Sequence, residues 1–379
     1  MNKQKKILIY ALLPFFLFGF FRNTKVYAAE VSVSAKSCIL MTADTKQVVF
    51  GKAEKEKLSM ASTTKIMTAL LAIERIETGG NEIVEITEEM VMVEGSSMGL
   101  RAGDKVSIEG LVTGLLLPSG NDAANAIALY ISGSAEEFAA LMNERAEKIG
   151  MSDTNFVTPS GLDNDEHYST AYDMALLAAE VLKNPLFLNV CSSKYKEVVF
   201  ENPEKTVKYK NHNKLLSRYE GCIGMKTGFT KKSGRCLVSV AEREGVRLIS
   251  VTLSAPDDWQ DHAAMFNFGF SRIEKFAFDG RDFEAEIPTV GAFERSLKVK
   301  GSYGGSVTIP KGDRDRIFRR VELPRFVYAP LRKDETVGRI SYYLDDKRIY
   351  SIPLKLTESA VFLKEEKKNL LEKIFGGRS

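Results

Sequence analysis

Apolar residues recur at helical spacing through much of the first two thirds of the chain. This pattern predicts helices over residues 61–76, 135–149 and 171–182. The second helix is expected to end at Gly150 and the third before Pro185. Strand-like stretches lie within residues 31–49 and at residues 247–253, and the second has the composition of a buried strand. This alternation continues to about residue 275 and predicts an α/β (α+β) domain in which helices cover a sheet.

Beyond residue 276 the pattern changes to short strands separated by glycine, proline and acidic pairs. The predicted strands flank Gly304-Gly305 and Asp345-Asp346 and cover residues 296–300, 306–310, 337–344 and 347–354. This segment, residues 277–356, is expected to form a small all-β domain. It carries no combination of catalytic residue types, so we expect it to position the first domain, residues 30–276.

The first 29 residues have the pattern of an export signal. Three lysines precede the mostly apolar run 7–21, and a small-residue cleavage pattern ends at Ala28. This run of 15 residues is shorter than the ~20 that a membrane-spanning helix needs, and it contains Pro14. A cleaved signal peptide is therefore favoured over an uncleaved anchor. We expect the protein to be exported to the outer face of the cytoplasmic membrane or the cell wall space.

Charge and length narrow the classes of function further. Removal of residues 1–29 takes away five of the 53 basic residues and none of the 50 acidic ones, which changes the net charge from +3 to −2. A nearly neutral chain lacks the cationic character that binds phosphates, so nucleic acid is not an expected partner. The remaining 350 residues exceed a typical single domain, and two domains are expected.

Neither the cysteines nor the histidines form a recognisable metal or disulfide pattern. The four cysteines are too few and too scattered for a disulfide framework, and buried free thiols are expected. The three histidines lie far apart without a metal-binding spacing, so no metal is predicted, and their scarcity argues against a Ser-His-Asp triad. The cysteines are Cys38, Cys191, Cys222 and Cys236, and the histidines are His167, His212 and His262.

The sequence Ser-Thr-Thr-Lys at residues 62–65 opens the first predicted helix. Residues three apart share a helix face, so Lys65 can reach the hydroxyl of Ser62 and activate it as a nucleophile. The first turn of a helix also presents free N–H groups that stabilise an oxyanion. A serine followed three residues later by a lysine occurs often by chance. For this motif alone, the alternative is a helix cap followed by a solvated lysine.

Two further short motifs follow in the chain. Ser119 and Asn121 lie in a polar turn between two apolar helical runs, where a loop with an asparagine cap is the alternative explanation. Lys226, Thr227 and Gly228 lie on the first strand of a predicted hairpin that turns at about residues 231–232. A cation, a hydroxyl and a position without a side chain suit a strand that binds a carboxylate while its backbone lies close to the ligand.

The three motifs in this order resemble those of a low-molecular-mass penicillin-binding protein, a serine-type D-alanyl-D-alanine carboxypeptidase of peptidase family S11. Residues 94–104, 110–125, 151–162 and 168–175 also resemble segments of that family. The resemblance covers residues 30 to about 275 strongly and the remainder loosely. It implies a penicillin-binding/transpeptidase-like domain with an antiparallel sheet flanked by helices.

The resemblance also implies a set of roles. Ser62 attacks the carbonyl between two terminal D-alanines of a peptidoglycan stem peptide, and Lys65, with a lowered pKa, takes its proton. Lys226 adds positive potential and attracts the substrate carboxylate. Ser119 relays the proton to the departing D-alanine, and Asn121 holds the peptide amide. Lys65 then activates the water that hydrolyses the acyl-enzyme, and no cofactor is required.

The remaining implied roles concern the third motif. The oxyanion would lie between the backbone N–H groups of Ser62 and Phe229, Thr227 would add a hydroxyl to the carboxylate site, and Gly228 would allow close approach of the strand. Some relatives also hold the carboxylate with an arginine in the segment that follows the strand at 246–254. Residues 257–262 contain no arginine, so the sequence assigns no second carboxylate-binding group.

Two other functions share this motif set. A class A β-lactamase needs a deacylating glutamate in an E-x-x-L-N loop, and the nearest string here begins with Pro185 in place of the acid. Slow release of penicillin is therefore expected, with β-lactams acting as covalent inhibitors. A penicillin-binding sensor or wall-binding module without activity is disfavoured, because a pure binder gains nothing from a lysine desolvated beside a serine.

The last segment, within residues 357–379, has an amphipathic helical pattern over residues 361–375. Large apolar residues cluster on one side and are flanked by both lysines and glutamates. Relatives of the family often end in an amphipathic helix that lies on the membrane, and this interpretation is favoured here. A helix packed on the β-domain is the alternative.

Overall fold

The computed structural model describes residues 31–363 of the 379-residue chain. The predicted signal peptide, residues 1–29, and most of the predicted C-terminal helix lie outside the described residues. Residues 361–363 are described and are not helical: Phe362 forms a β-bridge with Ala292, and the N–H of Leu363 donates to the Gly291 carbonyl at 2.7 Å. The prediction that a helix begins at residue 361 is therefore wrong, because these residues pair with a neighbouring loop.

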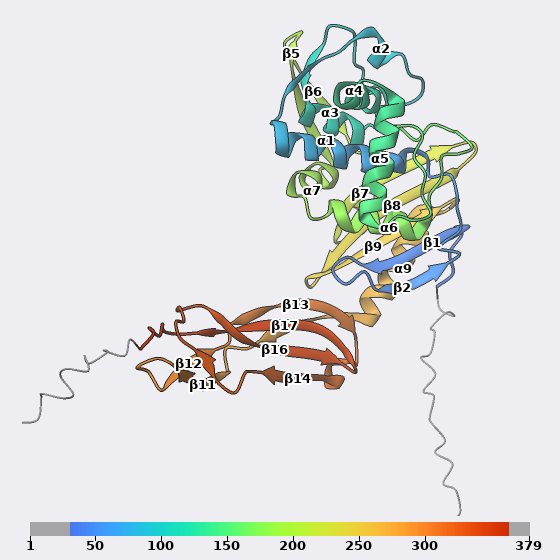
Figure 1. Cartoon of the computed structure of the whole chain (residues 1–379). Coiled ribbons are helices and arrows are strands. Elements are labelled where there is room, and N and C mark those ends of the chain that lie inside the picture. The colour runs from blue at the N-terminus through green and yellow to red at the C-terminus, as the bar shows by residue number, and fades with distance from the viewer. Residues whose placement is uncertain (1–30, 364–379) are drawn as a thin grey trace, which may run out of the picture. The chain divides into compact units, whose positions relative to one another are not determined.

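An antiparallel five-stranded sheet forms the centre of the first domain (Figure 1). Its strand order is β2-β1-β9-β8-β7. The strands are β1 Ser37–Thr42, β2 Val48–Lys52, β7 Cys222–Thr230, β8 Gly234–Arg243 and β9 Val246–Leu253. Both predicted features of this sheet, the buried strand near residues 247–253 and the hairpin that turns near residues 231–232, are confirmed. Strand β7 is an edge strand of this sheet, so within the described residues only one side of its backbone pairs with another strand.

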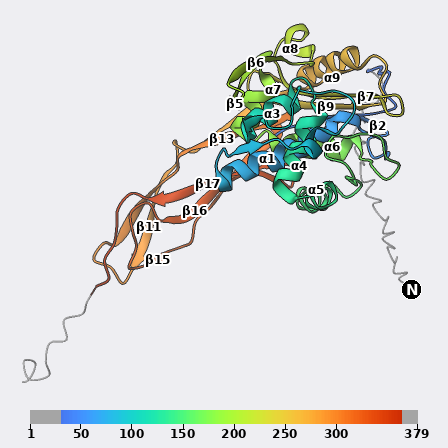
Figure 2. The same ribbon diagram turned by 90° about the horizontal axis from the view of Figure 1, so that it is seen from above.

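Both faces of this sheet are buried. Ile39 and Met41 of β1 point into the larger apolar core, whereas Cys38 and Leu40 point into a second core. Alternate residues of a strand face opposite sides, so a continuous apolar run is what two covered faces require. Helix α9, Asp258–Arg272, packs against β8 and β9 and contributes to the second core (Figure 2).

The larger core lies on the other face and is built mainly from helices. These are η1 Ala61–Thr64, α1 Lys65–Gly79, α2 Glu88–Val91, α3 Ile108–Leu116, α4 Asn121–Ser132, α5 Ala135–Ile149, α6 Ala171–Val181 and α7 Pro185–Ser192. The predicted end of α5 is confirmed, because Gly150 adopts a left-handed φ of 92° and caps the helix. The hydroxyl of Thr170 caps α6 by accepting from the Asp173 N–H.

A four-stranded sheet and a short helix were not predicted from the sequence. The sheet has the order β3-β4-β5-β6, with β3 Ile83–Glu85, β4 Lys105–Ser107, β5 Tyr195–Asn202 and β6 Lys205–Lys210, and the helix is α8 Leu215–Arg218. The strands of this sheet are short or rich in charged residues, so their sequences show only a weak pattern of apolar residues. The second motif lies between two helices that were predicted, α3 and α4.

The C-terminal part of the described chain is rich in strands. They are β10 Ile273–Asp279, β11 Glu284–Val290, β12 Ser296–Lys300, β13 Tyr303–Pro310, β14 Ile317–Glu322, β15 Val327–Tyr328, β16 Thr336–Leu344 and β17 Lys347–Leu356, with the short helix η2 Arg314–Arg316. The turn at residues 345–346 joins β16 to β17 as predicted. Gly304 and Gly305 lie inside β13, which pairs with β10, so they do not separate two paired strands.

In residues 31–363, no single helix combines the length and apolar character needed to cross a membrane. Helices α6 and α7 meet those two criteria only together, as a pair bent by 110°.

Candidate active site

The first motif forms a tight turn at the start of α1. Ser62 lies in the 3-10 turn η1, and Lys65 is the first residue of the α-helix. Ala61, directly before the serine, has a φ of 48°, a conformation that non-glycine residues adopt at a cost. Gly161 lies against this turn, since a Cβ there would come within 2.0 Å of the Ala61 carbonyl oxygen. The serine is thus fixed in position by a strained and closely packed turn.

The Lys65 amine lies at the centre of the site. Its Nζ is 2.9 Å from the Ser62 hydroxyl, 2.7 Å from Asn121 Oδ1 and 2.8 Å from the Ser160 carbonyl oxygen. Lys65 is fully buried, and this burial lowers its pKa well below the usual 10.5. The Lys226 charge lowers the pKa further, whereas Asp122 raises it. Both causes of the lowering favour a neutral amine.

These three contacts match the needs of a base. A neutral amine has two hydrogens and one lone pair. Asn121 and Ser160 offer oxygen acceptors for the two hydrogens, which leaves the lone pair to accept the hydroxyl proton of Ser62. The carbonyl of Ser160 was not identified from the sequence, because any residue supplies a backbone oxygen.

The second motif positions the amine of Lys65. Ser119 has a φ of 67° and is almost fully buried, and Asn121 begins α4. The Asn121 side chain accepts from Lys65 and donates to the Glu94 carbonyl oxygen at 2.7 Å. Because both ends of this amide bind protein groups, Asn121 orients the lysine here, a contact that the sequence interpretation did not include.

Asp122, the next residue, holds a loop beside the site. Its buried carboxylate accepts from the Ser97 hydroxyl at 2.6 Å and from the N–H groups of Met98, Gly99 and Leu100 at 2.9 to 3.0 Å. The Asn121 N–H donates to the Ser96 carbonyl at 2.6 Å. The start of α4 and the loop at residues 94–100 are therefore one hydrogen-bonded unit. Sequence reasoning missed this role of Asp122.

The third motif lies on the edge strand β7. Lys226 is buried, its Nζ donates to the Thr227 carbonyl at 2.9 Å, and burial lowers its pKa to about 7. A Cβ at Gly228 would come within 3.0 Å of the Ser62 nitrogen and 3.1 Å of the Met60 carbonyl oxygen, so a side chain there would push the strand away from Ser62. This explains the glycine.

A hollow of about 310 Å³ opens at Ser62. Five of the eight predicted residues line it, and Lys65 and Asn121 lie behind Ser62 through the hydrogen bonds above. Lys226 is not in the lining, and it acts on Lys65 through its charge. The lining residues are Ser62, Ser96, Ser119, His212, Lys214, Thr227, Gly228, Phe229, Arg235, Asp258 and Trp259.

Six of these residues were not predicted from the sequence as part of a site. Among them, His212 was expected to be structural or exposed, but it lines the hollow, and burial together with the nearby Lys226 and Lys210 lowers its pKa. The other two histidines serve packing: His167 contacts Thr64 at 2.8 Å, and His262 is buried between Ser239 and Thr252. The six unpredicted lining residues come from distant parts of the sequence, and only strand pairing and helix packing bring them together.

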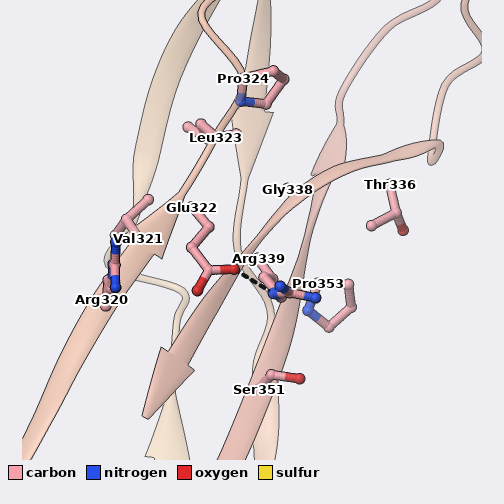
Figure 3. Close-up of a pocket in the computed structure, with 10 residues that line it drawn as sticks. All are labelled: Arg320, Val321, Glu322, Leu323, Pro324, Thr336, Gly338, Arg339, Ser351 and Pro353. Carbon is pink, nitrogen blue, oxygen red and sulfur yellow. Dashed lines mark hydrogen bonds and ion pairs between the residues drawn. The ribbon is translucent and has the colours of Figure 1, made fainter. Parts of the chain in front are cut away.

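A larger hollow of about 740 Å³ lies among the C-terminal strands (Figure 3). Its lining includes the ion pair of Glu322 and Arg339 and the hydroxyl of Ser351. It has no serine beside a lysine and no other paired nucleophile and base among its lining residues. Within residues 31–363, no group of three or more His, Cys, Asp or Glu side chains is placed to hold a metal ion.

Comparison with known proteins identifies the class. Residues 23–257 match the family model of D-alanyl-D-alanine carboxypeptidases, peptidase family S11, and residues 284–361 match the C-terminal domain of penicillin-binding protein 5. The first match covers more than half of the chain. The chain belongs to the peptidase S11 family, and the resemblance seen in its motifs is confirmed.

Individual relatives agree with this family. The chain is 31% identical over 365 residues to the D-alanyl-D-alanine carboxypeptidase DacF of Bacillus subtilis, covering 94% of this chain and 92% of the relative. It is 34% identical over 345 residues to DacC of Escherichia coli, with 86% and 84% covered. The structure of penicillin-binding protein 5 from Haemophilus influenzae is similar with a TM-score of 0.69 and 29% identity, covering 87% of this chain and 98% of that one. The predicted fold class is confirmed.

Proposed function

We propose that this protein is a serine D-alanyl-D-alanine carboxypeptidase that removes the terminal D-alanine from peptidoglycan stem peptides through an acyl-enzyme on Ser62. The relatives named above are described as enzymes of this type, and this chain shares their family over most of its length. The single observation that best supports the mechanism is the Lys65 amine, buried and 2.9 Å from the Ser62 hydroxyl.

The reaction follows from this contact. The lone pair of Lys65 takes the Ser62 proton as the oxygen attacks the carbonyl carbon between the two D-alanines. Ser119, which lines the same hollow, passes the proton to the departing amine, and D-alanine leaves. The lysine then deprotonates a water molecule that attacks the ester, which releases the shortened peptide and restores the serine.

The strand β7 supplies the groups for the substrate. Thr227 offers its hydroxyl to the terminal carboxylate, and Lys226 adds positive potential, because an incoming carboxylate favours the protonated form of an amine whose pKa is about 7. The N–H groups of Ser62 and Phe229 form the oxyanion site in this proposal. The close approach of Gly228 to the Ser62 nitrogen supports this arrangement.

Labelling with penicillin tests the nucleophile. Purified protein incubated with benzylpenicillin should gain the mass of one intact penicillin, located on Ser62 by peptide mapping. The adduct should persist far longer than one peptide turnover, because the segment at Pro185 begins helix α7 and offers no deacylating glutamate. An adduct on another residue would refute the assignment of Ser62. Rapid penicillin hydrolysis would favour a β-lactamase.

Release of D-alanine from diacetyl-Lys-D-Ala-D-Ala tests the activity itself. We expect turnover by the wild-type protein and none by Ser62→Ala. If penicillin labels Ser62 but the peptide is not cleaved, the protein is a penicillin-binding sensor and not a carboxypeptidase.

We also propose export to the outer face of the cytoplasmic membrane, with attachment through the C-terminal segment. The lysines and apolar run before Ala28 support export, and the apolar cluster within residues 364–375 supports attachment. Deletion of residues 364–379 should release the mature protein from membrane fractions and leave cleavage of a soluble peptide unchanged. Equal partitioning of the truncated and full-length proteins would reject the anchor.

A further inference from the structure

The hollow at Ser62 contains an arginine that neither the motifs nor the sequence interpretation assigned. Arg235 is the second residue of β8 and pairs directly with Phe229 across the β7–β8 hairpin. Directly opposite residues of an antiparallel pair project from the same face, and so do residues two apart on one strand. Arg235 therefore shares a face with Thr227, and both line the hollow that contains Ser62.

The spacing between these two residues suits a carboxylate. Thr227 pairs with Leu237, which makes Arg235 its diagonal neighbour, and diagonal positions of an antiparallel pair lie roughly 7–8 Å apart. An arginine side chain bridges part of this distance. A carboxylate between a threonine hydroxyl and a guanidinium can accept from both, and the guanidinium fork can bind it through two parallel hydrogen bonds.

Two residues of α9 hold the guanidinium of Arg235 in place. Its Nε donates to Asp258 Oδ1 at 2.9 Å, and the carboxylate of Asp258 is only 2% exposed. The centre of the guanidinium also lies 5.6 Å from the ring centroid of Trp259. In the part of the chain that the structure describes, its two terminal nitrogens make no hydrogen bond to protein. A fixed Nε with two free terminal nitrogens is a preorganised anion receptor.

Lys226 can act on the carboxylate only through its charge, because its side chain is not part of the lining of this hollow. It is buried, and its Nζ donates to the Thr227 carbonyl oxygen. Its charge acts on Lys65. Arg235 therefore brings two guanidinium nitrogens that are free to donate hydrogen bonds into the lining of the hollow that contains Ser62.

We propose that Arg235, oriented by Asp258, binds the free terminal carboxylate of the substrate together with Thr227 and thereby restricts the enzyme to the carboxyl end of peptides. This assignment rests on the function proposed above and adds the residue that selects the substrate class. Arg235 is a substrate-binding residue in this proposal, and Asp258 is a positioning residue.

The test compares two substrates that differ only in the terminal charge. Wild-type protein is assayed with diacetyl-Lys-D-Ala-D-Ala and with its C-terminal amide, and the ratio of the two kcat/KM values measures selection for the carboxylate. Arg235→Gln should lower kcat/KM for the free acid about tenfold to hundredfold, the range for a lost charge-assisted hydrogen bond. The substitution should leave kcat/KM for the C-terminal amide almost unchanged. The loss should lie mainly in KM, because the carboxylate is bound before and during the reaction.

Three further variants sharpen the result. Arg235→Lys keeps the charge but not the fork, so it should restore only part of the selection. Asp258→Asn should give an intermediate loss on the free acid alone. Arg218→Gln is the matched control, because Arg218 lines the adjacent hollow with Arg235 but not the one that contains Ser62. It should match the wild-type protein on both substrates.

Several outcomes would overturn the proposal. Equal losses on the acid and the amide would mean that Arg235 only supports the fold, and a thermal melt of each variant would show this independently. A selective loss in Lys214→Gln but not in Arg235→Gln would assign the carboxylate to Lys214, which lines the same hollow. If the wild-type protein cleaves neither substrate, the proposed function itself fails. If the wild-type protein is active and Arg235→Gln keeps the same ratio of kcat/KM for the acid and the amide, only the role of Arg235 is refuted.

Discussion

At the scale of single residues, the two buried lysines of the site have different tasks. In the proposed mechanism, Lys65 exchanges a proton with Ser62, whereas Lys226 supplies charge. Lys65→Arg should abolish penicillin acylation although a long basic side chain is kept, because a guanidinium cannot be deprotonated at any pH that a protein tolerates. Lys226→Arg should be milder, because that position needs a cation and not a base. Rates of acylation of Ser62 measured by mass spectrometry would separate them, and equal losses would contradict this division.

The electrostatic link between these lysines gives a pH prediction. The charge of Lys226 lowers the pKa of Lys65, so its removal raises that pKa and leaves less neutral amine at a given pH. Lys226→Gln should therefore move the acidic limb of the kcat/KM profile to higher pH. Asp122 has the opposite effect on Lys65, so Asp122→Asn should move the limb to lower pH. Profiles that shift in the same direction in both variants would contradict this electrostatic account.

At the scale of elements, the loop at residues 94–100 depends on one carboxylate. Asp122→Ala leaves three backbone N–H groups and the Ser97 hydroxyl without this acceptor. An unsatisfied buried donor costs about 1–3 kcal/mol, so the variant should lose at least that much of its free energy of unfolding. Urea denaturation measures this loss. Asn125→Ala is a suitable control, because its amide binds the Glu89 and Met90 carbonyl oxygens from the partly exposed side of the same helix.

The same elements show how far the sequence alone leads. The end of α5 at Gly150 and the β7–β8 turn follow from local chemistry, and the Ser62–Lys65 contact follows from spacing within one helical turn. Arg235 and Asp258 could not be paired in this way. Their contact depends on the register of β8 and on the packing of α9 against the sheet, which are tertiary features. The charged strands of the four-stranded sheet were missed because pairing, and not an apolar pattern, defines them.

At the scale of the whole molecule, two buried histidines link stability to acid. His262 is fully buried, contacts Ser239 and Thr252, and has a pKa lowered by burial from 6.5 to about 3. Burial likewise lowers the pKa of His167 to about 4. Below pH 6.5 the unfolded chain binds protons at these histidines and the folded chain does not. Acid therefore favours unfolding, and the free energy of unfolding continues to fall until the pH reaches the pKa values of these histidines in the folded protein.

The size of this effect can be measured with one substitution. His262→Gln removes the titrating group, so the stability advantage of the wild-type protein over this variant should shrink as the pH falls. Between pH 7.5 and 5 it should shrink by about 2 kcal/mol, because each pH unit below 6.5 contributes about 1.4 kcal/mol. Other titrating groups are common to both proteins and cancel in the difference. Urea unfolding at the two pH values gives this quantity. An advantage that stays constant would mean that folded His262 takes up a proton as readily as the unfolded chain.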